Sequence, residues 1–121
     1  MLFKKKILYK DWLWYWMQKK KDYIKESTYS NYSNIISNHI IPELGNIKLS
    51  NLNNKLIQEF LINKYKTGRL DGNGGLSYKT IRDIIAVVKS SLKYAIKEEM
   101  INNINLDFTY PKIGNKDKIS D

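Results

Sequence analysis

Apolar residues recur along the chain at spacings of three and four, in four separate segments. This spacing is typical of helices that bury one face. The first predicted helix spans residues 7–21 and the second spans residues 28–41. The third follows Asn53 and the fourth follows Ser77, and both of these residues are favourable N-caps. The pattern therefore predicts a single all-α domain of four helices.

The four predicted helices each have an apolar face that would contribute to one core. The faces comprise Leu8, Trp12, Leu13, Tyr15, Trp16 and Met17 in the first helix, Tyr29, Tyr32, Ile35, Ile36 and Ile40 in the second, Ile57, Phe60, Leu61 and Tyr65 in the third, and Ile81, Ile84, Ile85, Val88, Leu92 and Ala95 in the fourth. Trp14 lies off the first face. Stacking of Trp14 on a DNA base is an alternative that the pattern favours less than packing of the tryptophan-rich face.

Signals at the helix ends predict how the segments are joined. Ser27 or Thr28 is expected to cap the second helix, and Pro42 and Gly45 are expected to end it with a turn. Residues 68–75 contain four glycines but lack the Gly-Lys-Ser/Thr ending of a phosphate-binding loop. We therefore interpret this stretch as a flexible connection.

The composition adds a strong positive charge to this picture. Of the 121 residues, 21 are Lys or Arg and 12 are Asp or Glu, which gives a formal net charge of +9. Such a surplus favours a polyanionic partner, nucleic acid or an anionic membrane, unless the cations are spread evenly over the surface. The chain has no cysteine, which excludes disulfides and thiolate metal sites and fits a cytoplasmic location. No apolar run is long enough for a signal peptide or a membrane span. A membrane-surface domain anchored by the tryptophan-rich first helix is an alternative, but it needs the tryptophans and leucines to be exposed, whereas the core requires them, so no membrane partner is expected.

The fourth predicted helix shows where this charge is concentrated. At 100° per residue its cations fall on one stripe, well over a quarter turn from the apolar face. The stripe consists of Lys79, Arg82, Lys89, Lys93 and Lys97. No acidic residue interrupts it, because Asp83 and Glu98 lie off the stripe. A solvated helix face usually mixes both signs of charge, so the stripe favours contact with an anionic partner.

No constellation of residues for catalysis can be identified. His39 is the one histidine, so a metal site is improbable, and the residue is expected to pack or to cap the second helix. No serine has a recognisable base or elbow motif, and no pair of acids is clearly placed for acid–base work. None of the nine tyrosines is surrounded by the Arg and His residues that stabilise a transferring phosphoryl group. We therefore expect no cofactor, no metal ion and no small-molecule substrate.

Two stretches carry a family pattern. The first, TYSNYSNIISNHIIPELGNIKLSNL from Thr28, contains Thr-Tyr-x-x-Tyr, an apolar helix, His-Ile-x-Pro-x-Leu-Gly and a later Leu. The second, LSYKTIRDIIAVVKSSLKYAIKEEMI, contains Leu-Ser-x-x-Thr, a helix with Tyr-Ala near its end, and an Ile before Asn. The matching residues are Thr28, Tyr29, Tyr32, His39, Ile40, Pro42, Leu44, Gly45, Leu49, Leu76, Ser77, Thr80, Ile81, Leu92, Ala95, Ile101 and Asn103. The chain thus resembles the core-binding, or SAM-like N-terminal, domain of phage integrases and other tyrosine recombinases.

The resemblance covers roughly residues 7–111 and implies a four-helix SAM-like orthogonal bundle. In the family this domain forms half of a C-shaped clamp around double-stranded DNA, and its second and fourth helices face the DNA. One departure is Ile104, where the family usually has proline. Residues 1–111 are expected to be the core-binding domain, and residues 112–121 a polar tail or the start of a linker. The catalytic domain with its tyrosine nucleophile is absent, so the chain is expected to be a fragment of a longer protein, or the product of a truncated gene, and no enzyme by itself.

The stripe and the resemblance together assign DNA-contacting roles. Lys89, Lys93 and Lys97 are expected to pair with phosphates. Lys79, Thr80 and Arg82, on the first turns of the fourth helix, are the candidates for base edges, with Arg82 as the bidentate partner of a guanine. A further set at the start of the second helix would either reach a phosphate or merely cap the helix, and it comprises Ser27, Thr28 and Asn31.

Other partners and an alternative function remain open at this stage. The catalytic domain of the same full-length protein is an expected partner, and self-association on DNA is possible within the family pattern. The alternative is a helical protein–protein interaction module without a DNA role, which predicts an exposed apolar patch and binding that is insensitive to salt.

Overall fold

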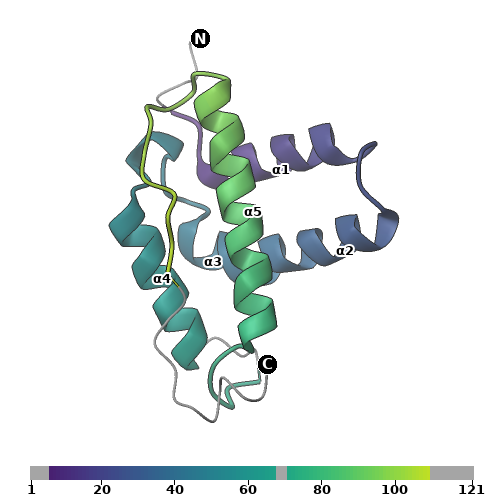
Figure 1. The fold of residues 1–121 in the computed structure, drawn as a ribbon, viewed down its shortest axis with the longest axis vertical. Helices are drawn as coiled ribbons and strands as arrows, with labels where there is room; N and C mark the ends of the chain where they lie inside the picture. Colours follow the sequence, from purple (N-terminus) through teal and green to yellow (C-terminus); the bar gives the residue numbers. More distant parts are fainter. Residues whose placement is uncertain (1–5, 68–70, 110–121) are drawn as a thin grey trace.

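The computed structural model describes residues 6–67 and 71–109, and its regular elements are helices (Figure 1). They are α1 (Tyr9–Lys20), α2 (Glu26–Ile35), α3 (Ile41–Leu44), α4 (Asn54–Thr67) and α5 (Tyr78–Lys97). A π-helical segment, Ile36–Ile40, joins α2 to α3, and a short 3₁₀ turn precedes α4. The described residues contain no strand, and their β pairing is an isolated bridge between Leu8 and Lys48. The prediction of an all-α fold is confirmed.

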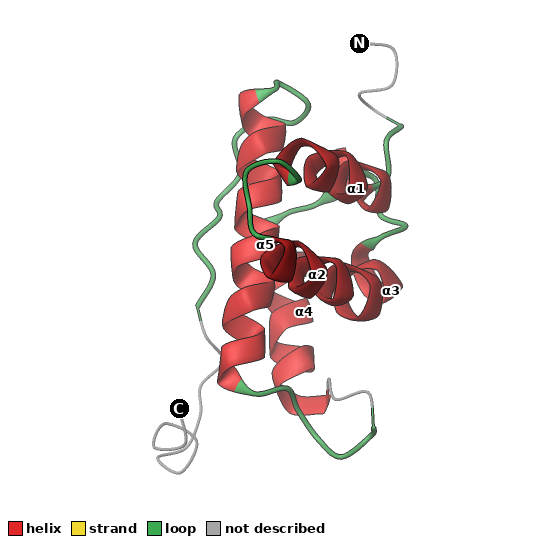
Figure 2. Cartoon of the chain, turned by 90° about the vertical axis from the view of Figure 1, so that its right-hand side faces the viewer, coloured by secondary structure: helices red, strands yellow, loops and turns green. Residues whose placement is uncertain are grey.

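The helices cross rather than run parallel. Figure 1 shows α1 and α2 side by side and antiparallel, both crossing α5 steeply, while α4 runs beside α5 in the opposite direction. The view in Figure 2 looks along α1 and α2 and shows α5 behind them. Apolar faces from all four long helices meet in this crossing. The buried hydrophobic residues are Tyr9, Trp12, Leu13, Trp16, Met17, Ile35, Ile36, Ile40, Leu44, Leu49, Leu52, Ile57, Phe60, Leu61, Ile81, Ile84, Ile85, Val87, Val88, Leu92, Ala95 and Met100.

Helix α5 is the element on which α1 packs. Its six predicted apolar residues are all buried, which confirms that face. Two polar contacts join α1 to Ser91 of α5. The Tyr9 hydroxyl lies 2.8 Å from Ser91 Oγ, and Trp12 Nε1 donates to the Ser91 carbonyl at 2.8 Å. The prediction that Tyr15 belongs to the buried face of α1 is wrong, because its side chain is 40% exposed. Tyr15 lies at the edge of that face, where its ring still packs beside Trp12.

The start of α2 differs from the prediction. The helix begins at Glu26, and its N-cap is Lys25, which makes no side-chain capping bond. Ser27 and Thr28 therefore lie inside the first turn, and neither is the N-cap. The first backbone bond of this turn, from the Tyr29 amide to the Lys25 carbonyl at 2.9 Å, places the start two to three residues earlier than expected.

The end of this helix also differs, because the chain passes Pro42 without a turn. The Ile41 amide donates to the Ile36 carbonyl five residues back, so the helix widens by one residue just before the proline. Proline has no amide hydrogen and crowds the preceding turn, and a π-bulge is one way to accommodate it. Gly45 then ends α3, where a Cβ would lie 2.6 Å from the Ile41 carbonyl oxygen. Its carbonyl accepts the Lys10 amide at 3.0 Å, which satisfies one of the free donors at the start of α1.

The predicted starts of α4 and α5 are confirmed. Asn53 Oδ1 accepts from the Leu56 amide at 2.9 Å, and Ser77 Oγ accepts from the Thr80 amide at 3.2 Å. Part of the glycine-rich connection between these helices, residues 68–70, lies outside the described residues. Within the described part, Gly75 passes so close to the Tyr65 carbonyl that no Cβ would fit without a shift of the backbone. This stretch is therefore packed at Gly75 rather than uniformly flexible.

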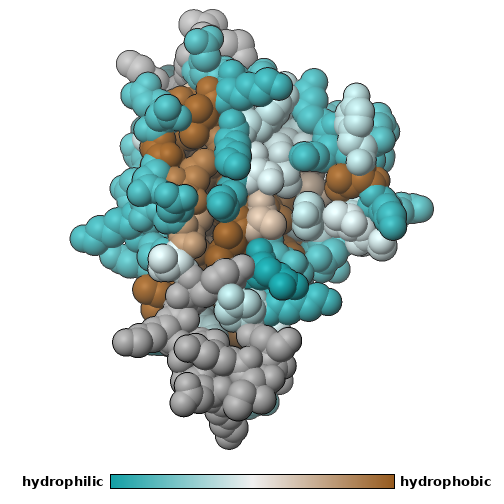
Figure 3. Space-filling model, in the orientation of Figure 1, coloured by the Kyte–Doolittle hydropathy of each residue, from teal (hydrophilic) through white to brown (hydrophobic). Residues whose placement is uncertain are grey.

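The segment after α5 does not leave the domain. Residues 101–109 return along α4 in an extended course, which Figure 1 shows in yellow-green. Ile104, Leu106 and Phe108 are half-buried against the core, while the residues between them are exposed. Figure 3 shows apolar side chains gathered along this part of the surface. We call residues 101–109 the C-terminal strap. The predicted tail, residues 112–121, lies outside the described residues.

Two side-chain amides of α4 hold the strap in register. Asn54 Nδ2 donates to the carbonyls of Asn105 and Asp107, both at 3.0 Å. Gln58 pairs with Thr109 in both directions, since its Nε2 donates to the Thr109 carbonyl and its Oε1 accepts the Thr109 amide, each at 2.9 Å. The strap is thus fixed by polar contacts on one side and by apolar packing on the other.

Replacing both amides, in an Asn54→Ala, Gln58→Ala variant, is expected to release the end of the strap without unfolding the helices. The two bonds to Thr109 contribute about 1 kcal/mol each, so exchange of its amide hydrogen should become at least roughly tenfold faster. Hydrogen exchange followed by NMR measures this directly. A Glu59→Ala variant, changed at an exposed position of the same helix, is the control. Unchanged exchange at Thr109 would mean that the apolar residues alone hold the strap.

Candidate nucleic-acid interface

The cationic stripe of α5 lies on the side of the helix opposite the core. Lys79, Arg82, Lys93 and Lys97 are exposed, and Lys89 is half-buried. Ala86 and Ser90 complete this surface and are exposed as well. We call this surface the α5 basic face. From Lys79 to Lys97 it extends over roughly 27 Å at 1.5 Å per residue, which is most of one turn of duplex DNA.

The charges of the α5 basic face are not neutralised by neighbouring carboxylates. None of the five cations forms an ion pair with a carboxylate of the described residues, and the Lys64–Glu43 pair joins α4 to α3 instead. Asp83 is half-buried, and Glu98 follows the end of the helix. In Figure 3 hydrophilic side chains lie where Figure 1 places α5, beside the apolar side chains that gather along the C-terminal strap. Unpaired cations in such a row create a positive potential that attracts polyanions.

The N-terminal end of α5 brings together Lys79, Thr80 and Arg82. Lys79 and Arg82 are exposed, whereas Thr80 is half-buried and its Oγ1 lies 3.1 Å from Ser77 Oγ. The Thr80 hydroxyl is thus already engaged in the cap, which leaves the two cations as the groups most available to a ligand. The free amides at this end of the helix add partial positive charge.

The predicted contacts on α2 lie apart from those on α5. Ser27 and Asn31 are exposed and Thr28 is half-buried, all within the first two turns of α2. Figures 1 and 2 show that the N-terminus of α2 is at the outer tip of the α1–α2 layer, while the N-terminus of α5 is at the lower end of the molecule. The two predicted groups therefore do not converge on one small site.

His39 packs, as expected, and belongs to a buried polar cluster that the sequence did not reveal. It is 8% exposed, and its Nδ1 has no hydrogen-bond partner among the described residues. Lys64 is also buried, with its Nζ 2.7 Å from Glu43 Oε2. Burial lowers the pKa of His39, the Lys64 charge lowers it further, and the Glu43 charge raises it in part. In the described residues no group of three or more His, Cys, Asp or Glu side chains is placed to hold a metal ion.

The lowered pKa of His39 predicts that the domain loses stability as the pH falls through about 6.5. Below that value the unfolded chain binds a proton at His39 while the folded chain does not, so protonation favours unfolding. The loss is at most about 1.4 kcal/mol per pH unit. Denaturant unfolding between neutral and mildly acidic pH measures it. A His39→Gln variant should lack this dependence, because carboxylates titrate lower. An equal loss in that variant would assign the effect to another group.

No helix within residues 6–67 and 71–109 is both long enough and apolar enough to cross a bilayer.

The described residues form a bundle of crossing helices in which α5 carries the basic face. A family model described as phage integrase, N-terminal SAM-like domain, matches residues 3–65, which is more than half of the chain. The protein therefore belongs to the phage integrase N-terminal SAM-like domain family. The matched region includes α1 to α3 and most of α4, so α5 and its basic face lie beyond it. No curated protein and no solved structure matches the chain significantly.

Proposed function

We propose that this chain binds double-stranded DNA as the core-binding domain of a site-specific tyrosine recombinase, at the site of recombination. The observation that carries the proposal is the α5 basic face, a row of five cations with no carboxylate paired to it in the described residues. Membership of an integrase domain family supplies the biological context. This domain would then bind the DNA, and a catalytic domain would carry out strand cleavage and joining.

In this proposal the residues divide into two roles. Lys89, Lys93 and Lys97 contact phosphates and set affinity and register, because lysine is a flexible point charge. Lys79 and Arg82 approach base edges from the first turn of α5, and Arg82 is suited to a bidentate contact with guanine. The remaining proposed contacts come from Thr80 on α5 and from Ser27, Thr28 and Asn31 on α2.

The proposal extends to the organisation of the full protein. Residues 1–111 form the DNA-binding unit, and residues 112–121 begin the linker to the catalytic domain, which is the intramolecular partner. Copies of the protein associate with one another on DNA. The domain needs no cofactor and acts in the cytoplasm, where the DNA is accessible.

Binding to a labelled AT-rich duplex, followed by fluorescence anisotropy over a series of salt concentrations, tests the proposal. If Lys89, Lys93 and Lys97 each pair with a phosphate, the logarithm of the association constant should fall with the logarithm of salt concentration with a slope of about −2.7. Dissociation constants in the micromolar range or weaker are expected at physiological salt. Absence of binding at low salt, or binding that ignores salt, would contradict the proposal and direct the search to a protein partner.

A further inference from the structure

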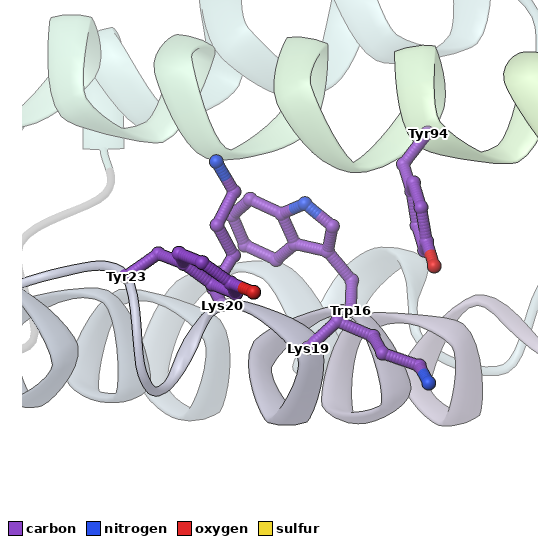
Figure 4. A pocket seen from close by; sticks show the side chains of 5 residues that line it. All are labelled: Trp16, Lys19, Lys20, Tyr23 and Tyr94. Carbon is purple, nitrogen blue, oxygen red and sulfur yellow. The ribbon is translucent and has the colours of Figure 1, made fainter.

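An open pocket of about 240 Å³ lies between α1 and α5, outside the proposed duplex contacts. Its walls are Trp16, Lys19 and Lys20 from α1, Tyr23 from the following turn, and Tyr94 from α5. Figure 4 shows Trp16 between Tyr23 and Tyr94, with Lys20 rising beside the indole and Lys19 extending toward the Tyr94 side. Three aromatic rings and two cations line this pocket, and no acidic residue is among them.

The aromatic walls are held in place by other rings. Trp16 stacks on Tyr32 at 6.2 Å between centroids, and Tyr94 stacks on Trp12 at 5.5 Å. The three rings differ in exposure: Trp16 is 2% exposed and forms the floor of the pocket, Tyr94 is half-buried, and Tyr23 is 85% exposed and offers its ring to solvent. An exposed aromatic ring next to a pre-arranged aromatic wall is a surface that a flat ligand ring can extend by stacking.

The cations lie where an anion attached to such a ring would be neutralised. Lys19 Nζ is 5.3 Å from the centroid of Tyr15, and Lys20 Nζ is 5.8 Å from the centroid of Trp16. Both ammonium groups thus lie close to the aromatic surface instead of pairing with carboxylates in the described residues. Burial, the Glu98 charge and the neighbouring Tyr15 raise the pKa of Tyr94.

We propose that this pocket binds unpaired nucleotides of a DNA strand, with bases stacking on Tyr23 and Tyr94 and phosphates pairing with Lys19 and Lys20. Base–aromatic stacking beside cations is how proteins hold single strands without reading their sequence. The pocket adjoins the α5 basic face, because Tyr94 lies directly after Lys93 and one turn before Lys97. The inference rests on the proposed function: a strand that separates from the bound duplex would enter the pocket.

The exposed position of Tyr23 allows a test that does not disturb the core. The probes are a labelled oligothymidylate and a labelled duplex of the same length, each titrated with the full chain. Tyr23→Ala should weaken oligothymidylate binding roughly five- to hundredfold, the range for the loss of one stacked base, and leave duplex binding unchanged. Tyr23→Phe should bind like the wild type. Trp14→Ala, which removes an exposed aromatic of α1 that does not line the pocket, is the matched control.

The outcomes separate this inference from the proposed function. A chain that binds neither probe overturns both. A chain that binds the duplex but not oligothymidylate, or that binds oligothymidylate equally well after Tyr23→Ala, overturns only the pocket inference. Displacement of the oligothymidylate by thymidine monophosphate at comparable concentration would also overturn it, since the ligand would then be a free nucleotide rather than a strand.

Discussion

A Lys89→Glu, Lys93→Glu variant is expected to lose at least about 60-fold in duplex affinity at roughly 0.1 M salt, because two phosphate contacts disappear. Each contact releases about 0.9 counterions, which corresponds to roughly eightfold in affinity at that salt concentration. The salt dependence should become shallower by about 1.8 in the logarithmic slope. Repulsion between the new carboxylates and the phosphates adds to the loss, so the figure is a lower bound. Fluorescence anisotropy with the labelled duplex measures both quantities.

The control must change the net charge equally without touching the proposed interface. Lys55→Glu, Lys66→Glu lowers the net charge from +9 to +5, as the test variant does, at two exposed positions of α4. If the α5 basic face is the interface, the control should bind DNA only slightly more weakly than the wild type. Equal losses in the two variants would show that overall charge, rather than this helix face, attracts the DNA.

Helix α5 was predictable because its sequence alone decides its environment. It is 20 residues long, and its six predicted apolar residues follow the helical period, so one face had to be buried. Its Ser77 cap is a local interaction within one turn, which a sequence can specify without knowledge of the rest of the fold. The cations then had to be on the outside, and they are.

Other features depended on contacts between distant residues. Lys64 continues the buried face of α4, and only its pairing with Glu43, 21 positions earlier, allows a charged group there. The burial of the strap also depends on a distant partner. The alternation of Ile104, Leu106 and Phe108 is too short to predict a buried segment unless the neighbouring α4 is known. Neither partner can be inferred from local periodicity.

The pocket between α1 and α5 was missed for a related reason. The tryptophan considered for base stacking was Trp14, since it lies off the apolar face of α1. Exposure alone does not create a binding surface, and Trp14 has no partner ring in the pocket. Tyr23 and Tyr94 are far apart in the sequence, and the crossing of α1 over α5 brings them to one pocket. A candidate site of this kind needs the tertiary structure.

That crossing is maintained by Trp12, and a Trp12→Ala variant is expected to lose about 3–5 kcal/mol in the free energy of unfolding. The side chain is 3% exposed, stacks on Tyr94 and donates a hydrogen bond to the buried Ser91 carbonyl. Its removal leaves a cavity between α1 and α5 and takes away the hydrogen bond that joins the two helices. Because small domains are stable by only about 5–15 kcal/mol, the variant should be close to unfolding at ordinary temperatures.

Denaturant unfolding followed by far-ultraviolet circular dichroism measures this loss, with Trp14→Ala as the matched control. The control removes the same atoms from the same helix at a side chain that is 39% exposed, so its cost should stay within about 0.5–1 kcal/mol. A Trp12→Phe variant keeps the stacking on Tyr94 but loses the hydrogen bond, and it should fall between the two. Similar costs for Trp12→Ala and Trp14→Ala would mean that α1 does not dock on α5 through Trp12. The pocket and its position beside the basic face would then lose their structural basis, whereas duplex binding by α5 itself would not depend on that contact.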